Sequence, residues 1–188
     1  MSFWSRIERG IESIAGDLIP DEFRERLSGA RKNLESGQLA EAETELQDLV
    51  RLRPDHAAAQ TLLGVTLLSQ EKIDAARDAF DRALALDAEL PEALIGRGNT
   101  ALVADSPELA IPYFRDAIDA AGGDQELLSE VYHALGRAYR SSGDLGKAIR
   151  ELRKAAAESG GNSAIIADLG DALSIDGSRS HTEARRYL

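Results

Sequence analysis

The side chains that could bind a metal or transfer protons are few in this 188-residue chain, and they are widely separated. A metal site needs several His, Asp, Glu or Cys ligands that the fold can bring together. The three histidines of the chain are His56, His133 and His181. None of them has a second ligand at the spacing typical of a metal site. The sequence therefore predicts no bound metal.

One run of carboxylates could in principle support acid–base chemistry. Its members are Glu41, Glu43, Glu45 and Asp48. They fall on a segment predicted to be a helix that faces water, and we interpret them as a solvated face. The segment Gly96-Arg97-Gly98 lacks the third glycine and the preceding strand of a dinucleotide-binding loop. No serine has a neighbouring base, so the sequence predicts no cofactor and no enzyme activity; a catalytic domain would have to lie beyond Leu188.

The composition narrows the classes of partner. The net charge is −11, and the estimated isoelectric point is 4.8. Nucleic acids and anionic membranes are bound largely through Lys and Arg, so this balance disfavours both. The absence of cysteine excludes disulfides and thiolate zinc sites. No run approaches the roughly 18 apolar residues that cross a bilayer, and the first residues lack a secretory pattern. We therefore predict a cytoplasmic protein without an integral membrane span.

Small and bulky apolar residues return at a nearly fixed step along the chain. At steps of 34, 34, 38 and 34 residues lie Ala30, Gly64, Gly98, Gly136 and Gly170. Three further ladders keep the same phase: Ala42, Ala76, Ala110 and Ala148; Leu46, Phe80, Phe114 and Leu152; Leu49, Ala83, Ala117 and Ala155. Such a period is typical of stacked repeat proteins, in which each unit buries its apolar face only against its neighbours. The pattern predicts an extended binding surface instead of a reaction pocket.

Each repeat is predicted to contain two helices. Apolar residues at helical spacing place them over 22–36, 39–52, 56–68, 73–86, 92–104, 107–121, 125–141 and 145–158. The units run over about 23–56, 57–90, 91–124 and 129–162, with a partial fifth unit over 163–188. In that fifth unit we expect one helix from Ser163 to about Ile175, a turn at Gly177 and a short helix from about Thr182. Either the natural chain continues past Leu188, or these residues form a frayed cap.

This layout resembles the tetratricopeptide repeat (TPR) family over about residues 23–188. The resemblance rests on the ladders, on the dipeptides Leu63-Gly64 and Leu135-Gly136, and on the closing proline Pro54. The early tryptophan of the family is missing from every unit, where the chain has Arg26, Gln60, Leu94, Tyr132 and Ile166. The resemblance implies an all-α, right-handed superhelical array (an α-solenoid) that serves in protein–protein interaction. Where the two helices of a unit cross, we expect Gly64 to meet Ala76.

In the resembled family, ligands lie in a concave groove lined by the first helix of each pair. Carried over position by position, the expected groove residues are Leu27, Arg31, Leu34, Thr61, Val65, Leu68, Ile95, Asn99, Leu102, His133, Arg137 and Arg140. The middle of this set is apolar, and Arg31 lies toward one end while Arg137 and Arg140 lie toward the other. We expect a peptide or an amphipathic helix with an apolar stripe flanked by acidic groups. The alternative is that some of these residues only pack one unit against the next.

The first 20 residues precede the repeats and carry their own apolar stripe. Its members lie at helical spacing and are Phe3, Ile7, Ile11, Ile14 and Leu18. The pattern predicts an amphipathic helix. It could cap the first unit, fold into a groove of its own or a neighbouring copy, or dock on a partner or a membrane surface. The runner-up function is accordingly a self-assembling module, a homo-oligomer in which this helix or a repeat face packs on another copy.

Overall fold

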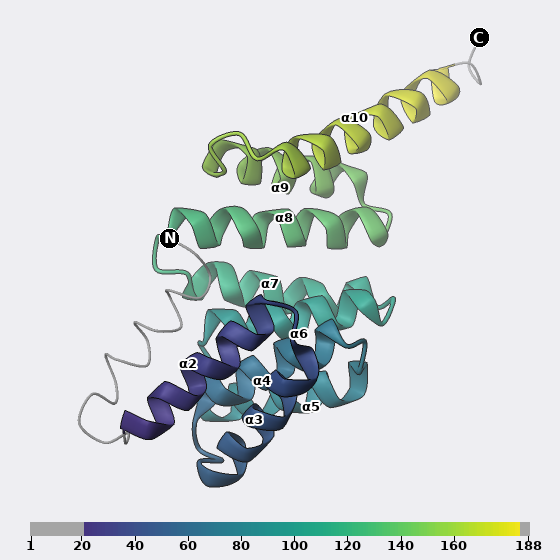
Figure 1. Cartoon of the computed structure of the whole chain (residues 1–188). Helices are drawn as coiled ribbons and strands as arrows, with labels where there is room; N and C mark the ends of the chain where they lie inside the picture. Colours follow the sequence, from purple (N-terminus) through teal and green to yellow (C-terminus); the bar gives the residue numbers. More distant parts are fainter. Residues whose placement is uncertain (1–20, 185–188) are drawn as a thin grey trace.

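The fold is an array of helix pairs stacked one on another. Figure 1 shows the computed structural model, which describes the backbone of residues 21–184 and the side chains of residues 21–177. Within residues 21–184 every regular element is an α-helix: α2 (Asp21–Glu35), α3 (Leu39–Leu52), α4 (Ala57–Ser69), α5 (Ile73–Leu86), α6 (Pro91–Val103), α7 (Pro107–Ala120), α8 (Gln125–Ser141), α9 (Leu145–Glu158) and α10 (Ser163–Ala184). The predicted all-α array is confirmed. The predicted helix over 1–20 lies outside the described residues.

Two rows of helices run through the array. We call α2, α4, α6, α8 and α10 the helices A, and α3, α5, α7 and α9 the helices B. Each helix packs on the next along the chain, and each helix A also packs on the following helix A. The two largest fully buried side chains, Phe80 and Phe114, come from helices B, as does the fully buried Leu152. The repeat therefore places one surface of helices A together, as a binding groove would require.

Three of the described helices begin at a side chain that caps them, and two others begin with a proline. The carboxylates of Asp124 and Asp144 accept hydrogen bonds from the backbone N–H groups of Leu127 and Lys147, both at 3.1 Å. At α4 the cap is His56, whose Nδ1 accepts the N–H of Ala59 at 3.2 Å. Pro91 and Pro107 begin α6 and α7, where a missing N–H costs nothing.

Glycines on helices A make room for bulky side chains from helices B. A Cβ added at Gly64 would lie 2.7 Å from the ring of Phe80, and one added at Gly98 would lie 2.6 Å from the ring of Phe114. At Gly136 the added atom would lie 2.7 Å from Cγ of Leu152. We call these three places the glycine notches. The nearest side chain at Gly64 is thus the Phe80 ring, where the sequence suggested Ala76.

The turn between the two helices of a pair repeats one backbone conformation. The residue with positive φ is Gly37 (78°), Glu71 (60°), Asp105 (53°) or Gly143 (85°), at steps of 34, 34 and 38 residues. Glycine adopts this left-handed conformation without strain, whereas a residue with a Cβ is strained by about 1–2 kcal/mol. In the turns α4–α5 and α6–α7, Glu71 and Asp105 therefore adopt the same conformation although it strains a residue with a Cβ.

Helix α10 differs from its prediction. The expected turn at Gly177 is wrong, because α10 continues without a break from Ser163 to Ala184. A glycine inside a helix costs only about 1 kcal/mol relative to alanine, so glycine alone does not end a helix. A serine at the N-cap of a helix is expected to bond to the first backbone N–H groups through its hydroxyl. Ser106 does occupy the N-cap of α7, but its hydroxyl makes no capping hydrogen bond and donates to the carbonyl of Ala104 instead.

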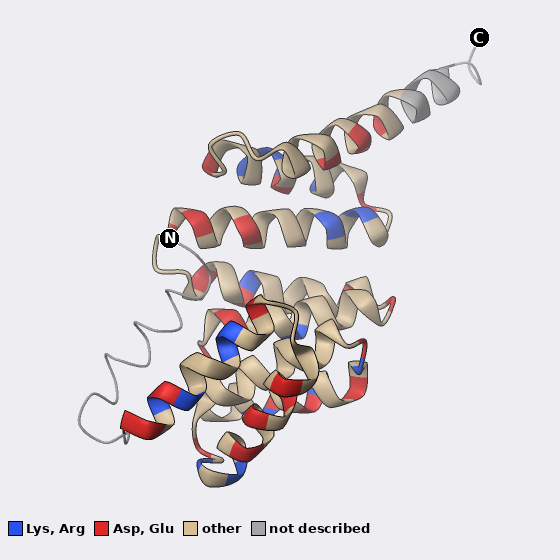
Figure 2. Ribbon diagram, viewed as in Figure 1, with Lys and Arg blue, Asp and Glu red and all other residues tan. Residues whose placement is uncertain are grey.

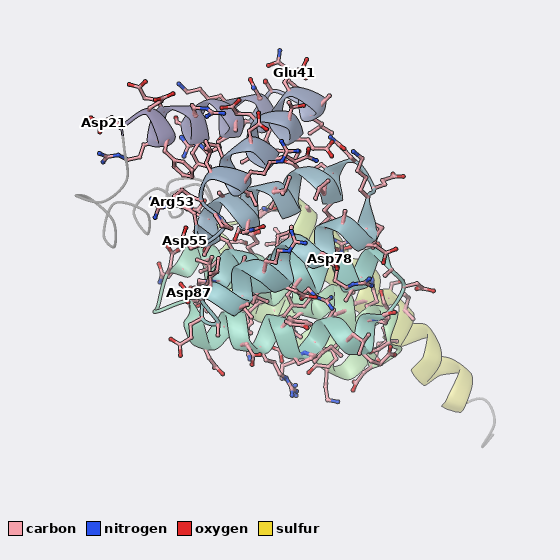
Figure 3. All side chains as sticks on the ribbon, turned by 90° about the horizontal axis from the view of Figure 1, so that it is seen from below. Asp21, Glu41, Arg53, Asp55, Asp78 and Asp87 are labelled. Carbon is pink, nitrogen blue, oxygen red and sulfur yellow. The ribbon has the colours of Figure 1, made fainter. Side chains whose placement is uncertain are left out.

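The carboxylate run on α3 is only partly solvated. Glu41 is exposed, and Figure 3 shows it pointing outward, as Asp78 does on α5. Glu43 and Glu45 are half-buried: Lys72 binds Glu43 at 2.7 Å, and Arg26 binds Glu45 at 2.6 Å. The hydrogen bond from Lys72 lowers the pKa of Glu43. These two carboxylates tie α3 to its neighbours, which explains why the run is not a free acidic face.

Candidate functional site

All twelve residues expected in the groove lie on helices A, but they do not share one environment. Leu27, Leu34, Thr61 and Ile95 are buried. The three apolar side chains of this group belong to the packed core, and the Thr61 hydroxyl donates to the carbonyl of Ala57 in its own helix. In this structure these four side chains pack between helices and present no surface to a ligand.

A second group keeps part of its surface exposed in the middle of the array. Val65 and Leu68 on α4 and Asn99 and Leu102 on α6 are half-buried. The three apolar members rest on the core clusters below them, and α4 and α6 pack side by side. We call these four residues the central strip. It combines apolar surface with one amide that can both donate and accept hydrogen bonds.

The two ends of the expected groove are already paired with acidic groups to different degrees. Arg31 is half-buried, and its Nε lies 3.8 Å from Glu35 Oε1. On α8, His133 Nε2 and Arg140 Nη1 lie 2.7 Å and 2.9 Å from the two carboxylate oxygens of Asp168 on α10. The chain itself thus supplies one of the acidic groups that we expected from a ligand.

The contact with Asp168 also sets its ionisation. Burial would raise the pKa of Asp168, but the hydrogen bond from His133 and the charge of Arg140 outweigh burial and lower it. The carboxylate is therefore charged at neutral pH. Arg137 is different: it is exposed, and no ion pair joins it to another residue within 21–177. Of the two arginines expected in the groove on α8, Arg137 is the one that can meet an acidic ligand.

A cleft that sequence reasoning did not identify lies at the start of α8. Its volume is about 990 Å³, and its lining includes Glu126, Glu130, His133 and Glu158. The acidic and basic residues of α8 are segregated, as Figure 2 shows by the red N-terminal half and the blue C-terminal half of the helix. The signal for this cleft was available in the sequence, since Glu126 and Glu130 lie one helical turn apart beside the Gly122-Gly123 break.

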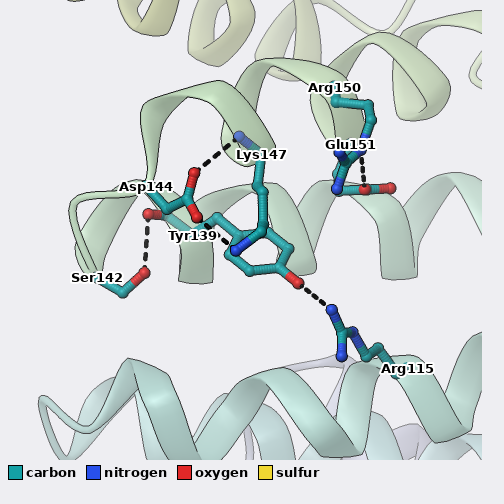
Figure 4. Close-up of polar contacts among 7 residues, drawn as sticks. All are labelled: Arg115, Tyr139, Ser142, Asp144, Lys147, Arg150 and Glu151. Atoms are coloured by element: carbon teal, nitrogen blue, oxygen red, sulfur yellow. Dashed lines mark hydrogen bonds and ion pairs between the residues drawn. The ribbon is translucent and has the colours of Figure 1, made fainter.

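A polar cluster at the C-terminal end of α8, shown in Figure 4, fixes the neighbouring helices. Arg115 on α7 donates to the hydroxyl of Tyr139 on α8 at 2.7 Å, and Lys147 Nζ on α9 lies 5.4 Å from the centre of the same ring. Lys147 also binds Asp144 at 2.6 Å. Tyr139 thereby joins three successive helices, which keeps the surface of α8 in a fixed position.

Two features can be assessed for the part of the chain that the structure describes: metal-ligand clusters and membrane-spanning helices. Among those residues no group of three or more His, Asp or Glu side chains could hold a metal ion. None of the helices within 21–184 is long and apolar enough to cross a membrane.

Comparison with known proteins supports the interpretation of the repeats as tetratricopeptide units. Two sequence profiles, both described as tetratricopeptide repeat, match residues 28–91 and 89–157. No curated protein sequence matches the chain.

Several solved structures share the fold. MamA from Desulfovibrio magneticus RS-1 is 22% identical with a TM-score of 0.72, over 87% of this chain and 91% of that one. PilF of Pseudomonas aeruginosa is 21% identical with a TM-score of 0.76, over 89% and 74%. YrrB, described as a TPR protein with an unusual peptide-binding site, is 20% identical with a TM-score of 0.65, over 92% and 84%. At these identities the likeness shows the fold.

Proposed function

The chain belongs to the tetratricopeptide repeat family, and from that premise we propose that it is a non-enzymatic scaffold that binds a peptide or an amphipathic helix along its helices A. The observation that carries the proposal is the central strip, where Val65, Leu68 and Leu102 keep apolar surface exposed beside the amide of Asn99. An apolar strip with few polar groups suits the buried face of an amphipathic helix or an extended segment.

The charges near the strip favour a ligand with an acidic end. Arg137 is exposed and can approach a carboxylate of the ligand. The acidic cleft at the start of α8 repels such a group, so a ligand would place its acidic end toward the C-terminal half of α8. The net charge of −11 favours a protein ligand over a nucleic acid. YrrB, with its described peptide-binding site, is a precedent for peptide binding on this fold.

The proposal revises the expected contact set. We retain Val65, Leu68, Asn99, Leu102 and Arg137 as residues that touch the ligand. The buried members of the original set, and the Asp168-bound pair His133 and Arg140, serve to position the helices.

The test is capture of partners from a lysate of the source organism with the full chain as bait. The groove variant is Leu68→Glu/Arg137→Glu. The matched control makes the same two chemical changes on helices B, as Leu109→Glu/Arg153→Glu, because both of these side chains are exposed. Circular dichroism spectra first establish that both variants keep their helical content.

We expect a protein that is retained by the wild type and by the control but is lost from the groove variant. Fluorescence titration with a labelled peptide from that protein would then give the affinity and its loss. Retention by both variants would overturn the groove as the binding surface. Loss only with the control would move the site to helices B.

A further inference from the structure

The last helix A carries a glycine notch that no side chain fills. Gly170 on α10 follows Gly136 by one repeat step of 34 residues, and Gly64, Gly98 and Gly136 each lie against a bulky residue of a helix B. At Gly170, however, an added Cβ would meet no heavy atom within 4 Å. The space that Phe80, Phe114 and Leu152 occupy in the preceding pairs is open at α10.

The open notch lies in an exposed apolar face. Ile166 and Leu173, which flank Gly170 at helical spacing, are 53% and 40% exposed. The equivalent positions on α8 are Tyr132, half-buried, and Tyr139, buried. On α10 the residues that pack toward α9 are instead Ile165, Leu169 and Ala172. The face around Gly170 is therefore the one that a helix B covers elsewhere in the array.

The chain itself does not cover this face within the described residues. Helix α10 continues to Ala184 without turning back, and Figure 1 shows it extending beyond the rest of the array. The occupant has to be a helix that offers a bulky apolar side chain to the notch and small residues on either side. That is the pattern of α5, α7 and α9, as in Ala110, Phe114 and Ala117.

The exposed face of α10 has this pattern itself. Along it, bulky and small residues alternate at steps of four, three and four: Ile166, Gly170, Leu173 and Gly177. In an antiparallel pair of two such helices, Gly170 of one copy lies opposite Leu173 of the other, and Ile166 lies opposite Gly177. Each copy then supplies the side chain that the notch of the other lacks, and each contact occurs twice because a two-fold interface is self-complementary.

We propose that the face formed by Ile166, Gly170, Leu173 and Gly177 pairs with the same face of a second copy of this chain. None of these four residues is charged, and Asp168 is held on another side of α10 by α8. Pairing of the two faces therefore buries no unpaired charge. The dimer is weak, because a single pair of helices buries less than the roughly 1,600 Å² of a standard interface. Each chain carries a net charge of −11, so added salt strengthens the dimer by screening the repulsion.

Sedimentation of the full chain over a concentration series tests this pairing. The wild type is expected to rise in mass from 20.3 kDa toward twice that value, at lower concentration when salt is added. Gly170→Glu and Leu173→Glu should each weaken the dimer at least tenfold. Neither change disturbs the monomer: Gly170 faces open space, and Leu173 is exposed.

The matched control is Ile175→Glu, since Ile175 is 42% exposed and lies two residues from Leu173, on the other side of the helix. It should dimerise like the wild type.

A swap of the two central residues tests the register. Leu173→Gly alone should weaken the dimer, whereas Gly170→Leu/Leu173→Gly should restore it, because a bulky residue of one copy again lies opposite a small residue of the other. Failure of the swap to rescue would overturn the antiparallel register. A wild type that stays monomeric would overturn the pairing. A dimer lost with Ile7→Glu/Ile14→Glu but kept with Leu173→Glu would assign the contact to the N-terminal segment. None of these outcomes depends on the peptide groove, whose test measures capture of another protein.

Discussion

Gly136 and Gly170 are the same residue at the same position of neighbouring repeats, yet their surroundings are opposite. At Gly136 an added Cβ would lie 2.7 Å from Cγ of Leu152, whereas at Gly170 it would meet nothing within 4 Å. The first glycine is required by packing, and the second only weakens its helix. The role of a given position in a repeat therefore depends on the helix that lies against it.

The same difference separates the two parts of the molecule in how they are held. The inner helix pairs hold two large apolar clusters, and the Phe80 ring lies against both Gly64 on the helix A before it and Gly96 on the helix A after it. Helix α10 rests on a small cluster with Ile149 and Leu152 and on the polar contact of Asp168. We therefore expect substitutions in the inner notches to act on the whole array, and substitutions on α10 to act locally.

The largest effect should come from the Phe80 ring. It is fully buried and lies against both Gly64 on α4 and Gly96 on α6. Phe80→Ala should lower the free energy of unfolding by about 3–5 kcal/mol, because it removes a large side chain that two helices cannot close over. Urea denaturation followed by circular dichroism measures this. Leu173→Ala on the exposed face of α10 should change it by about 0.5 kcal/mol or less. Similar losses in the two variants would contradict the division into inner and terminal regions.

Glycine-to-alanine changes should have opposite signs in the two regions. Gly98→Ala places a Cβ 2.6 Å from the Phe114 ring and should destabilise the protein by about 1–3 kcal/mol, since the core has to expand. Gly170→Ala meets no neighbour and should stabilise α10 by about 0.5–1 kcal/mol through helix propensity. Thermal denaturation of both variants at one low concentration checks the signs. Two changes of the same sign would show that the notch at Gly170 is filled.

Most of the helices could be predicted from the sequence. The bounds of α3, α5, α8 and α9 agree with their predictions to the residue, because proline, glycine and acidic caps mark the breaks and the 34-residue ladders fix the phase. The prediction failed at α10, where Gly177 was taken as a turn. Gly177 lies inside α10 and does not adopt the left-handed conformation with which a glycine commonly ends a helix.

The groove was harder to predict than the helices. The family positions correctly identify helices A, but they do not tell which side chains the neighbouring helix covers. Thr61 is fully buried, while Arg137 is exposed. The Asp168 contact with His133 and Arg140 spans one repeat step, so the pair could have been proposed only from the register of α8 and α10. The acidic cleft was missed because its lining combines the first half of α8 with the end of α9, the start of α10 and the loops before α8 and α10, which no ladder connects.

The polar contact of α10 gives the next prediction. Asp168→Asn removes the charge that holds His133 and Arg140, and we expect α10 to open more readily by about 1 kcal/mol. Amide hydrogen exchange should show faster exchange in α10 and unchanged exchange in α4. The pKa of Asp168 is lowered in the folded protein, so this stabilisation is present above the ordinary pKa of an aspartate and is lost as the pH falls below it. Faster exchange throughout the array would contradict a local role for Asp168.

The repeat turns allow a gain of stability in the inner region. Glu71 holds the left-handed conformation that Gly37 and Gly143 hold at the equivalent positions. Glu71→Gly should raise the free energy of unfolding by roughly 0.5–1 kcal/mol, because it relieves backbone strain by more than it adds unfolded-state entropy. The reverse change, Gly37→Ala, should lower it. Chemical denaturation of the two variants in parallel measures both signs, and a loss on Glu71→Gly would show that this turn is not strained.

The smallest expected effect is a different response to pH in two helices of the inner pairs, α4 and α9. Desolvation lowers the pKa of His56, whose neutral Nδ1 caps α4 and whose ring packs on Phe23. A histidine with a lowered folded pKa binds protons more readily when unfolded, so its stabilisation is complete above about pH 6.5 and declines as the pH falls below that value. The protection of the α4 amides, which is the exchange rate relative to the intrinsic rate at each pH, should therefore decrease between about pH 6.5 and 5 by an amount equivalent to less than 1 kcal/mol. Helix α9 is capped by the carboxylate of Asp144, whose pKa is lowered by its bonds to Lys147, and should not respond in this range. His56→Asn keeps a capping acceptor without titrating and should abolish the response of α4, whereas a response that survives in this variant would assign it to another group.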